Sequence, residues 1–288
     1  MAGAPGHRLG QIVGDALELA IEPVLREFAE HHELYLDTKG PRPARPGKKE
    51  VTWTDDLGNA HNLDYVLERG GDPNRVGTPA AFVESAWRRY TKHSRAKAQE
   101  IQGALLPLLT TYSNAKPFAG AVLAGRWTVG ALQQMRSSGL AILHIPYRDM
   151  VAVFSSAGVD IDSEETTPDV DLQAQVDAWE SLEERQRAAV GQAIRDCSPE
   201  KFLAFSSALE ATILRAVDRV TVLPLHGIAI TVATVVEAIR VVDSYAAPTA
   251  TPELVRFEVV VRYSNGDRVS GEFASRADAM DFLRTFAQ

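Results

Sequence analysis

The chain has 288 residues, a formal net charge of −8 and a single cysteine, Cys197. One cysteine excludes an internal disulfide framework and any zinc site built from several cysteines, and it suits a reducing cytoplasm. The first residues lack the apolar segment of a signal peptide, and proline and glycine interrupt the apolar run 220–236. We therefore expect a cytoplasmic protein with no membrane span, folded as one large domain or one and a half.

The first part of the chain moves from a helical pattern to strand-like patterns. Apolar side chains recur at helical spacing over residues 9–30, which predicts a long amphipathic helix. Residues 33–37 indicate a strand, and the segment 38–49, rich in proline and basic residues, indicates an exposed loop. Residues 51–68 predict two strands joined by a turn, and a third, more apolar strand is expected at 80–87.

Helices and strands then alternate. A helix is expected over 91–106, with Thr91 near its N-cap and a disturbance at Pro107. Further elements, in the order strand, helix, strand and helix, are expected at 118–125, 128–139, 140–147 and 148–158. This order predicts an α/β fold over residues 1–158, with a mixed central sheet flanked by helices.

The second half differs in composition from the first. The acidic stretch 160–172 indicates a linker or surface loop, and residues 173–245 form a mostly helical region by pattern. Residues 250–288 predict a small C-terminal ββα unit, a hairpin with an Asn-Gly turn at 265–266 followed by a helix. We detect no internal repeat.

Two carboxylates stand out in the predicted sheet. Asp64 lies in "LDYVLE" and Glu84 in "FVESAW", so neighbouring strands would bring both to one end of the sheet. Two carboxylates a few ångströms apart form a natural Mg²⁺ site, since Mg²⁺ prefers oxygen ligands and keeps waters for a substrate phosphate. Such a metal activates water and stabilises charge on a phosphoryl oxygen. The alternative is that both carboxylates face solvent at strand ends.

The order of helix, three strands, helix and strand, with Asp64 on the second strand of a hairpin and Glu84 on the next strand, resembles the PD-(D/E)xK nuclease superfamily. Restriction endonucleases are its best-known members, and the resemblance covers about residues 9–150. It implies a Mg²⁺-dependent, sequence-specific endonuclease that hydrolyses phosphodiester bonds in double-stranded DNA, of the type II restriction kind. It also implies a homodimer, because a two-fold protein matches a palindromic site.

The sequence departs from the superfamily motif at one position. The motif has a lysine two residues after its glutamate, where this chain has Ala86. The superfamily includes members in which a motif residue has moved to the following helix, which points to Lys97 as the replacement. Lys92 competes for this role, and Glu100, one helical turn after Lys97, could join the metal's ligands. For each of these residues the alternative is a solvated helix position.

The first helix of the superfamily often supplies a further carboxylate. The resemblance places it at Glu18, in "GDALE". Glu18 lies on the flank of the predicted helix, whereas Glu27 lies nearer its apolar face, so periodicity alone does not favour Glu18.

Positive charge is concentrated beside the second carboxylate. Residues 84–97 contain five Arg or Lys and one acidic residue, with Trp87 and Tyr90 between them. This pattern predicts a surface that contacts phosphates, made of Arg88, Arg89, Lys92, His93 and Arg95. The loop carrying Arg42, Arg45, Lys48 and Lys49 is expected to be an arm that orders on duplex DNA. The alternative is a basic, solvated surface.

Two other functions remain open. If Ala86 marks a decayed site, the protein binds DNA without cleaving it, and its binding needs no Mg²⁺. If the acidic mid-chain and the C-terminal hairpin are protein-interaction surfaces, no salt-dependent DNA binding is expected.

Overall fold

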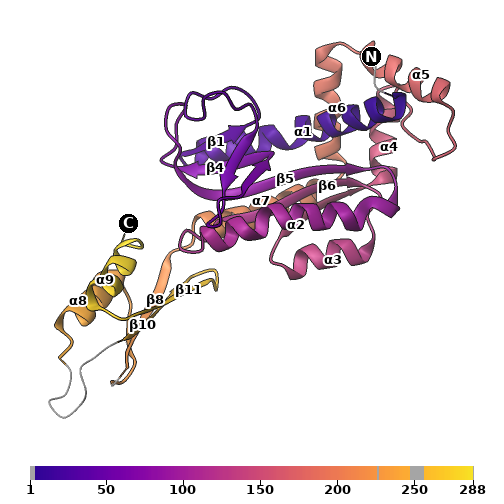
Figure 1. Ribbon diagram of the computed structural model, residues 1–288. Coiled ribbons are helices and arrows are strands. Elements are labelled where there is room, and N and C mark those ends of the chain that lie inside the picture. The colour runs from indigo at the N-terminus through magenta and orange to yellow at the C-terminus, as the bar shows by residue number, and fades with distance from the viewer. Residues whose placement is uncertain (1–3, 226, 247–255, 288) are drawn as a thin grey trace. The chain divides into compact units, whose positions relative to one another are not determined.

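The computed structural model describes residues 4–225, 227–246 and 256–287 (Figure 1). The chain divides into two compact units, residues 1–209 and 210–288. The predicted α/β core lies within the first unit. The region 173–245, which we expected to be mostly helical, is divided between the two units and includes two strands, at Val217–Pro224 and Ile230–Val232.

A mixed five-stranded sheet forms the centre of the first unit. Its strands are β1 (Leu34–Thr38), β4 (Tyr65–Arg69), β5 (Thr78–Arg88), β6 (Phe118–Gly125) and β7 (Ala141–Pro146), in the order β1-β4-β5-β6-β7. The pairs β1/β4 and β4/β5 are antiparallel, and β5/β6 and β6/β7 are parallel. The predicted hairpin is a separate two-stranded ribbon of β2 (Val51–Thr54) and β3 (Ala60–Leu63), so it does not join this sheet.

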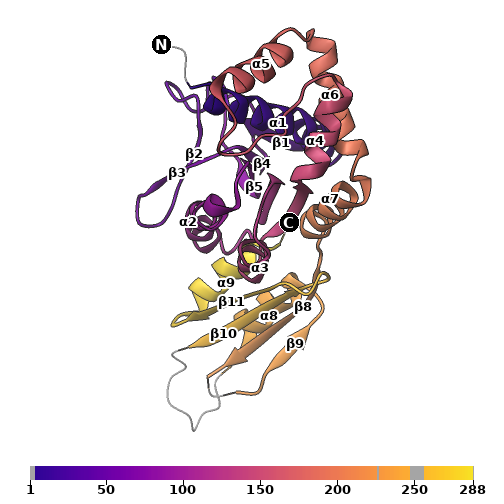
Figure 2. The ribbon, with the colours of Figure 1, turned by 90° about the vertical axis from the view of Figure 1, so that its right-hand side faces the viewer.

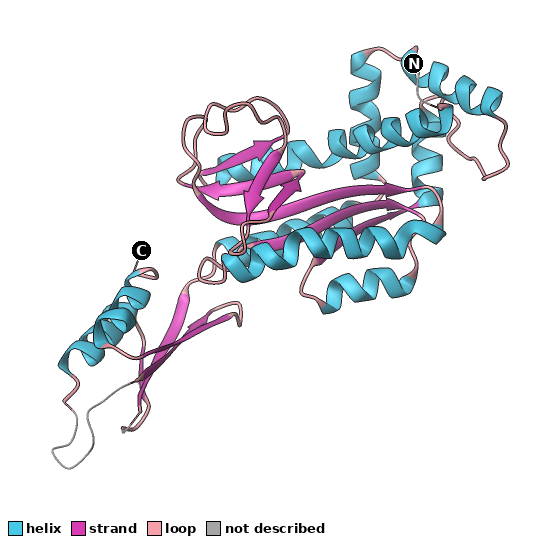
Figure 3. Ribbon diagram, in the orientation of Figure 1, coloured by secondary structure: helices cyan, strands magenta, loops and turns pink. Residues whose placement is uncertain are grey.

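Helices cover both faces of the five-stranded sheet (Figures 1 and 3). They are α1 (Pro5–His31) and α4 (Tyr147–Ser156) on one face, and α2 (Ser94–Thr111) and α3 (Val129–Ser137) on the other. All eight residues of β6 are buried, as expected for a parallel strand covered on both faces. The prediction of an α/β fold with a mixed sheet flanked by helices is confirmed.

The helix predicted over 91–106 begins near the expected residue, but the N-cap role of Thr91 and the predicted end were wrong. A 3₁₀ turn over Thr91–His93 precedes α2, so Thr91 is not the N-cap of the α-helix. The helix also continues through Pro107 to Thr111. Proline removes one backbone donor, but the fully buried Leu105 and Leu108 on either side hold the helix against the sheet.

The acidic stretch after α4 is not a free linker. Val159 and Ile161 are buried, and the Tyr147 hydroxyl donates to the Ile161 carbonyl at 3.2 Å. The same hydroxyl accepts from the Ser163 backbone N–H at 3.1 Å. Three helices follow: α5 (Asp169–Glu180), α6 (Glu184–Asp196) and α7 (Pro199–Ile213). Of these, α5 and α6 pack against α1 (Figure 2).

The second unit contains two successive ββα halves. The first half is β8 (Val217–Pro224), β9 (Ile230–Val232) and α8 (Val235–Ser244), and the second is β10 (Phe257–Tyr263), β11 (Arg268–Phe273) and α9 (Arg276–Arg284). The absence of an internal repeat was therefore a wrong prediction. The shared signal is the helix start: Thr234 with Glu237 opens α8, and Ser275 with Asp278 opens α9. In each pair the hydroxyl accepts from the backbone N–H three residues on.

The two halves form one antiparallel sheet in the order β11-β10-β8-β9. Both helices pack on one face of it, and buried valines of β8 and β10 fill the space between. The predicted Asn-Gly hairpin turn is confirmed, with Gly266 at a φ of +90°. None of the described helices has both the length and the apolarity that crossing a bilayer requires.

Candidate functional site

Asp64 lies at the junction between the ribbon and the central sheet. It sits between β3 and β4, one residue before the strand on which we expected it. Its Oδ2 accepts a 2.7 Å hydrogen bond from the Ser85 backbone N–H of β5. This bond fixes the orientation of the Asp64 carboxylate and brings it beside Glu84.

Glu84 lies in the middle of β5 and is only 7% exposed. The Asp64 backbone N–H hydrogen-bonds its carboxyl group, whereas its Oε1 is buried with no hydrogen-bond partner. A buried, unpaired carboxylate oxygen is costly for a folded protein unless a proton or a cation reaches it. The structure therefore brings the two predicted carboxylates together and leaves Oε1 of Glu84 without a partner.

The surroundings of both carboxyl groups disfavour their charged forms. Burial, and to a smaller extent the charge of Asp64, raise the pKa of Glu84 to about 8, while the charge of Lys97 opposes both effects. Burial also raises the pKa of Asp64, against the Ser85 hydrogen bond and the charge of Lys97. A site of this kind holds either a shared proton or a bound cation near neutral pH.

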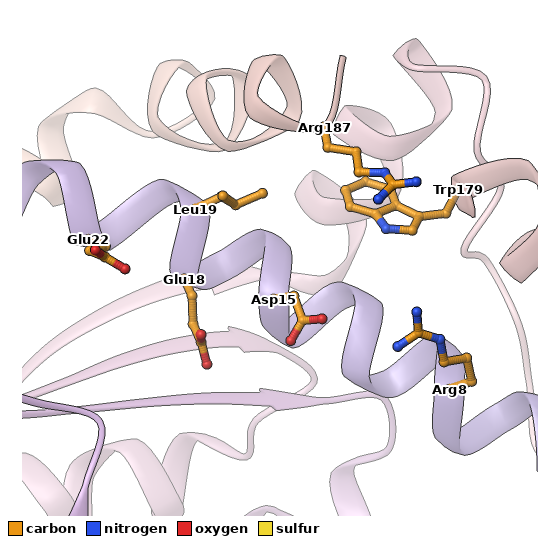
Figure 4. Close-up of a pocket in the computed structure, with 7 residues that line it drawn as sticks. All are labelled: Arg8, Asp15, Glu18, Leu19, Glu22, Trp179 and Arg187. Atoms are coloured by element: carbon orange, nitrogen blue, oxygen red, sulfur yellow. The ribbon is translucent and has the colours of Figure 1, made fainter. Parts of the chain in front are cut away.

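Glu18 joins this group from the α1 side. Partial burial is the main cause that raises its pKa to about 7, and the charges of Asp64 and Asp15 add to it. Its side chain keeps contact with solvent and points from α1 toward the strands (Figure 4). The resemblance suggested Glu18 as a further site residue, and that role stays a prediction.

A cavity of about 320 Å³ opens along α1 (Figure 4). Its lining side chains come from α1, α5 and α6, and they are Arg8, Asp15, Glu18, Leu19, Glu22, Trp179 and Arg187. Of Glu18, Asp64 and Glu84, only Glu18 lines this cavity. The cavity therefore flanks the proposed metal site and does not contain it.

The two candidate lysines have different partners. The Lys97 side chain, on α2, is 17% exposed, and its charge lowers the pKa of Asp64 and of Glu84. Its Nζ lies 2.6 Å from Oε1 of Glu100, which is largely exposed. Lys92 is 56% exposed and pairs instead with Glu165 at 2.5 Å. Electrostatics therefore favour Lys97 over Lys92 beside the two carboxylates.

Ala86, at the position of the motif lysine, is buried among the apolar side chains between the sheet and α2. A lysine there would have to place its charge in that core. The same core contains Ala98, the neighbour of Lys97 on α2. Lys97 of α2 therefore lies next to this core, and Ala86 of β5 lies inside it.

Asp64 and Glu84 offer two neighbouring carboxylates as possible metal ligands. Among the residues that the structure describes, no group of three or more His, Cys, Asp or Glu side chains could hold a metal ion. Mg²⁺ is commonly bound by one or two carboxylates, with waters and substrate phosphates as its remaining ligands. Asp64 and Glu84, with the free Oε1 of the latter, fit this pattern.

The predicted phosphate-contacting surface is exposed only in part. Arg88 is half-buried and donates to the Trp87 carbonyl at 2.9 Å, and burial lowers its pKa. Arg89 donates to the Gly6 carbonyl at 3.2 Å. His93 and Arg95 are exposed. The accessible part of this surface therefore consists of His93, Arg95 and Lys92, of which Lys92 is paired with Glu165.

The predicted DNA-binding arm was wrong for Arg42 and Arg45, because both side chains are buried. Arg42 Nη1 donates to Asp37 at 2.8 Å and to Glu68 at 2.6 Å. Arg45 binds both carboxylate oxygens of Asp37. The two arginines neutralise carboxylates on β1 and β4, so their role is structural. Of the four basic residues of the predicted arm, Lys48 and Lys49 are exposed.

Comparison with protein-family models gave no match for this chain, and comparisons with curated proteins and with solved structures gave none either.

Proposed function

We propose that the first unit is a Mg²⁺-dependent endonuclease of the PD-(D/E)xK type that hydrolyses phosphodiester bonds in duplex DNA. A type II restriction enzyme acting as a homodimer is the specific form we favour. The observation that carries the proposal is the neighbouring pair of carboxyl groups of Asp64 and Glu84. Burial raises the pKa of both, and the positive charge of Lys97 acts on both. The buried, unpaired Oε1 of Glu84 supports a cation as the missing partner.

The residues of this group would divide the work of hydrolysis. Asp64 and Glu84 would hold the metal, which when bound supplies an activated water and neutralises charge on the phosphoryl group. Ser85 fixes the Asp64 carboxylate through its backbone N–H. Lys97 would orient the attacking water or stabilise the negative charge of the transition state, and Glu100 holds its ammonium group at 2.6 Å.

A DNA-binding protein without catalysis is the second candidate. The observation that favours it is the burial of Ala86 at the position of the motif lysine. In that case Lys97 is a charge partner of the carboxylates and performs no chemistry.

Cleavage of a long, mixed-sequence duplex DNA tests the proposal. With Mg²⁺ the wild-type chain is expected to give discrete fragments, and with EDTA none. Asp64→Asn should abolish cleavage, whereas Asp56→Asn, a matched change at an exposed turn, should leave it unchanged. Fragments that persist with EDTA, or in Asp64→Asn, would overturn the proposal. Binding without cleavage in Mg²⁺ or Mn²⁺ would support the second candidate.

The two lysines predict a clear difference in rate. Lys97→Ala should slow cleavage by about 10²–10³-fold, because a preorganised positive group near the reacting phosphoryl contributes about that much. Lys92→Ala, which breaks only an exposed pair with Glu165, should stay within a few-fold of wild type. Single-turnover rates at saturating Mg²⁺, with DNA binding measured in parallel, separate chemistry from affinity. A normal rate in Lys97→Ala would remove Lys97 from the mechanism.

A further inference from the structure

Three arginines stand side by side across the sheet of the second unit. The strand register pairs Arg262 of β10 with Arg219 of β8 on one side and with Arg268 of β11 on the other. Directly paired residues of antiparallel strands point to the same face, with Cβ atoms about 4.5–5.5 Å apart. All three side chains are exposed. We call these three residues the arginine row.

The arginine row lies on the sheet face opposite the helices. The adjacent row of paired residues, Val220, Val261 and Val269, is buried. Successive residues of a strand alternate between faces, so the arginines point away from α8 and α9, which lie together on one side of this sheet (Figure 1). The row therefore occupies an open face that no described helix of this unit covers.

The fold of the unit gains nothing from this arrangement. Like charges directly opposite each other on neighbouring strands are destabilising. Arg219 has a neighbouring carboxylate, Asp218 at 2.8 Å. Within the described ranges, Arg262 and Arg268 form no ion pair. Two of the three positive charges, those of Arg262 and Arg268, are therefore uncompensated on an exposed sheet face, a cost that an anionic partner would remove.

On the open face, positive charge is concentrated at the end of the sheet that carries the arginine row. Next to the row stand Thr221, Val260 and Ser270, which are small and uncharged. At the far end Glu258 is paired across the strands with Glu272, and Arg256 forms an ion pair with Glu272 at 2.8 Å, so the excess positive charge of this face lies at the arginine row. Regularly spaced phosphates are complementary to the arginine row.

We propose that the arginine row binds the phosphate backbone of duplex DNA, and so adds a DNA-contacting surface outside the nuclease-like unit. The inference rests on the proposed function only for the choice of duplex DNA as the polyanion. Phosphate contacts of this kind hold and orient DNA but do not read its sequence. They give a chain of net charge −8 a local site for a polyanion.

The test is the salt dependence of DNA binding by the full chain in EDTA, where no cleavage occurs. Each phosphate contact contributes about 0.9 to the slope of log affinity against log salt. Replacing all three arginines by glutamine should therefore reduce the slope by about 2.7 and weaken binding at least about tenfold near 0.1 M salt. Arg240→Gln, an exposed arginine on α8, is the matched control and should bind like wild type.

The substitutions should not unfold the unit, since they relieve repulsion between like charges; Arg262→Gln is expected to keep or raise its thermal midpoint. A triple variant with unchanged slope and affinity would overturn the inference alone. If the triple variant has the smaller salt slope but the wild-type chain does not cleave DNA with Mg²⁺, the inference stands and the proposed nuclease function is overturned. A wild-type chain that binds no duplex, or that prefers single-stranded RNA or polyglutamate, would overturn the choice of partner.

Discussion

Glu84→Gln is expected to make the first unit more stable at alkaline pH and to abolish cleavage. Burial and Asp64 raise the pKa of Glu84 from 4.5 to about 8. The folded state therefore keeps a proton that the unfolded state releases, and wild-type stability falls as pH rises from about 4.5 to about 8. If the full shift is realised, this loss approaches about 5 kcal/mol. Glutamine cannot ionise, so the variant avoids the loss.

Urea unfolding between pH 4 and pH 9 measures this effect. The four tryptophans, Trp53, Trp87, Trp127 and Trp179, all lie in the first unit, so their fluorescence follows that unit alone. Wild type and Glu84→Gln should agree near pH 4 and diverge by a few kcal/mol at pH 9. Added Mg²⁺ should stabilise wild type at alkaline pH and leave the variant unchanged. Parallel curves at every pH would show that the pKa of Glu84 is not raised in the folded protein.

Arg42→Ala is expected to destabilise the first unit by about 3–5 kcal/mol, the cost of removing one partner from a buried ion pair. The Arg42 side chain is 3% exposed and neutralises Asp37 together with the fully buried Glu68. It also donates to the carbonyls of Asp72 and Arg75 at 2.8 Å. The substitution leaves buried carboxylates and two loop carbonyls without this donor.

Arg75→Ala is the matched control, because Arg75 has an exposed guanidinium and lies in the same loop whose carbonyls Arg42 binds. Its loss should change stability by less than about 0.5 kcal/mol. Arg42→Lys should recover only part of the stability, since an ammonium cannot reproduce the two-pronged contact with Glu68. Tryptophan-detected urea unfolding separates the three variants. An Arg42→Ala variant as stable as the Arg75 control, with DNA affinity reduced, would restore the DNA-binding arm.

The sequence allowed much of the first unit and its carboxylate pair to be predicted. Alternating patterns located the strands, and their adjacency placed Asp64 near Glu84. The candidate Lys97 came from the resemblance, which implies a lysine that the chain lacks at Ala86, and the charge of Lys97 acts on both carboxylates in the structure. The strands and the carboxylate pair rested on local periodicity and on neighbouring strands, whereas the lysine rested on the resemblance.

The errors involved long-range pairing. Arg42 and Arg45 lie in a loop whose composition indicates exposure, and nothing local shows that Asp37 and Glu68 are buried and need partners. The strand β8 was missed for a similar reason. Its apolar run fits a buried helix as well as a strand, and its pairing with β10 crosses a long stretch of chain. Tertiary pairing decided both cases.

The repeat in the second unit was missed because the two halves share the order of their strands and helix but few identical residues. Val222 pairs with Val259 at the centre of the sheet, but the flanking strand residues differ between the halves. Only the starts of the helices, at Thr234 and Ser275, carry a common pattern. A comparison of capping patterns, in place of residue identity, would have detected the two halves.

Cleavage of long duplex DNA by Glu84→Gln, beside wild type, is the measurement that tests the metal site most directly. The stability curve first shows that the variant is folded, so a loss of activity cannot be attributed to unfolding. We predict discrete fragments from wild type with Mg²⁺ and none from the variant at any Mg²⁺ concentration. Equal fragment yields from both proteins would contradict the assignment of Glu84 as a metal ligand and, with it, the proposed site of phosphodiester hydrolysis.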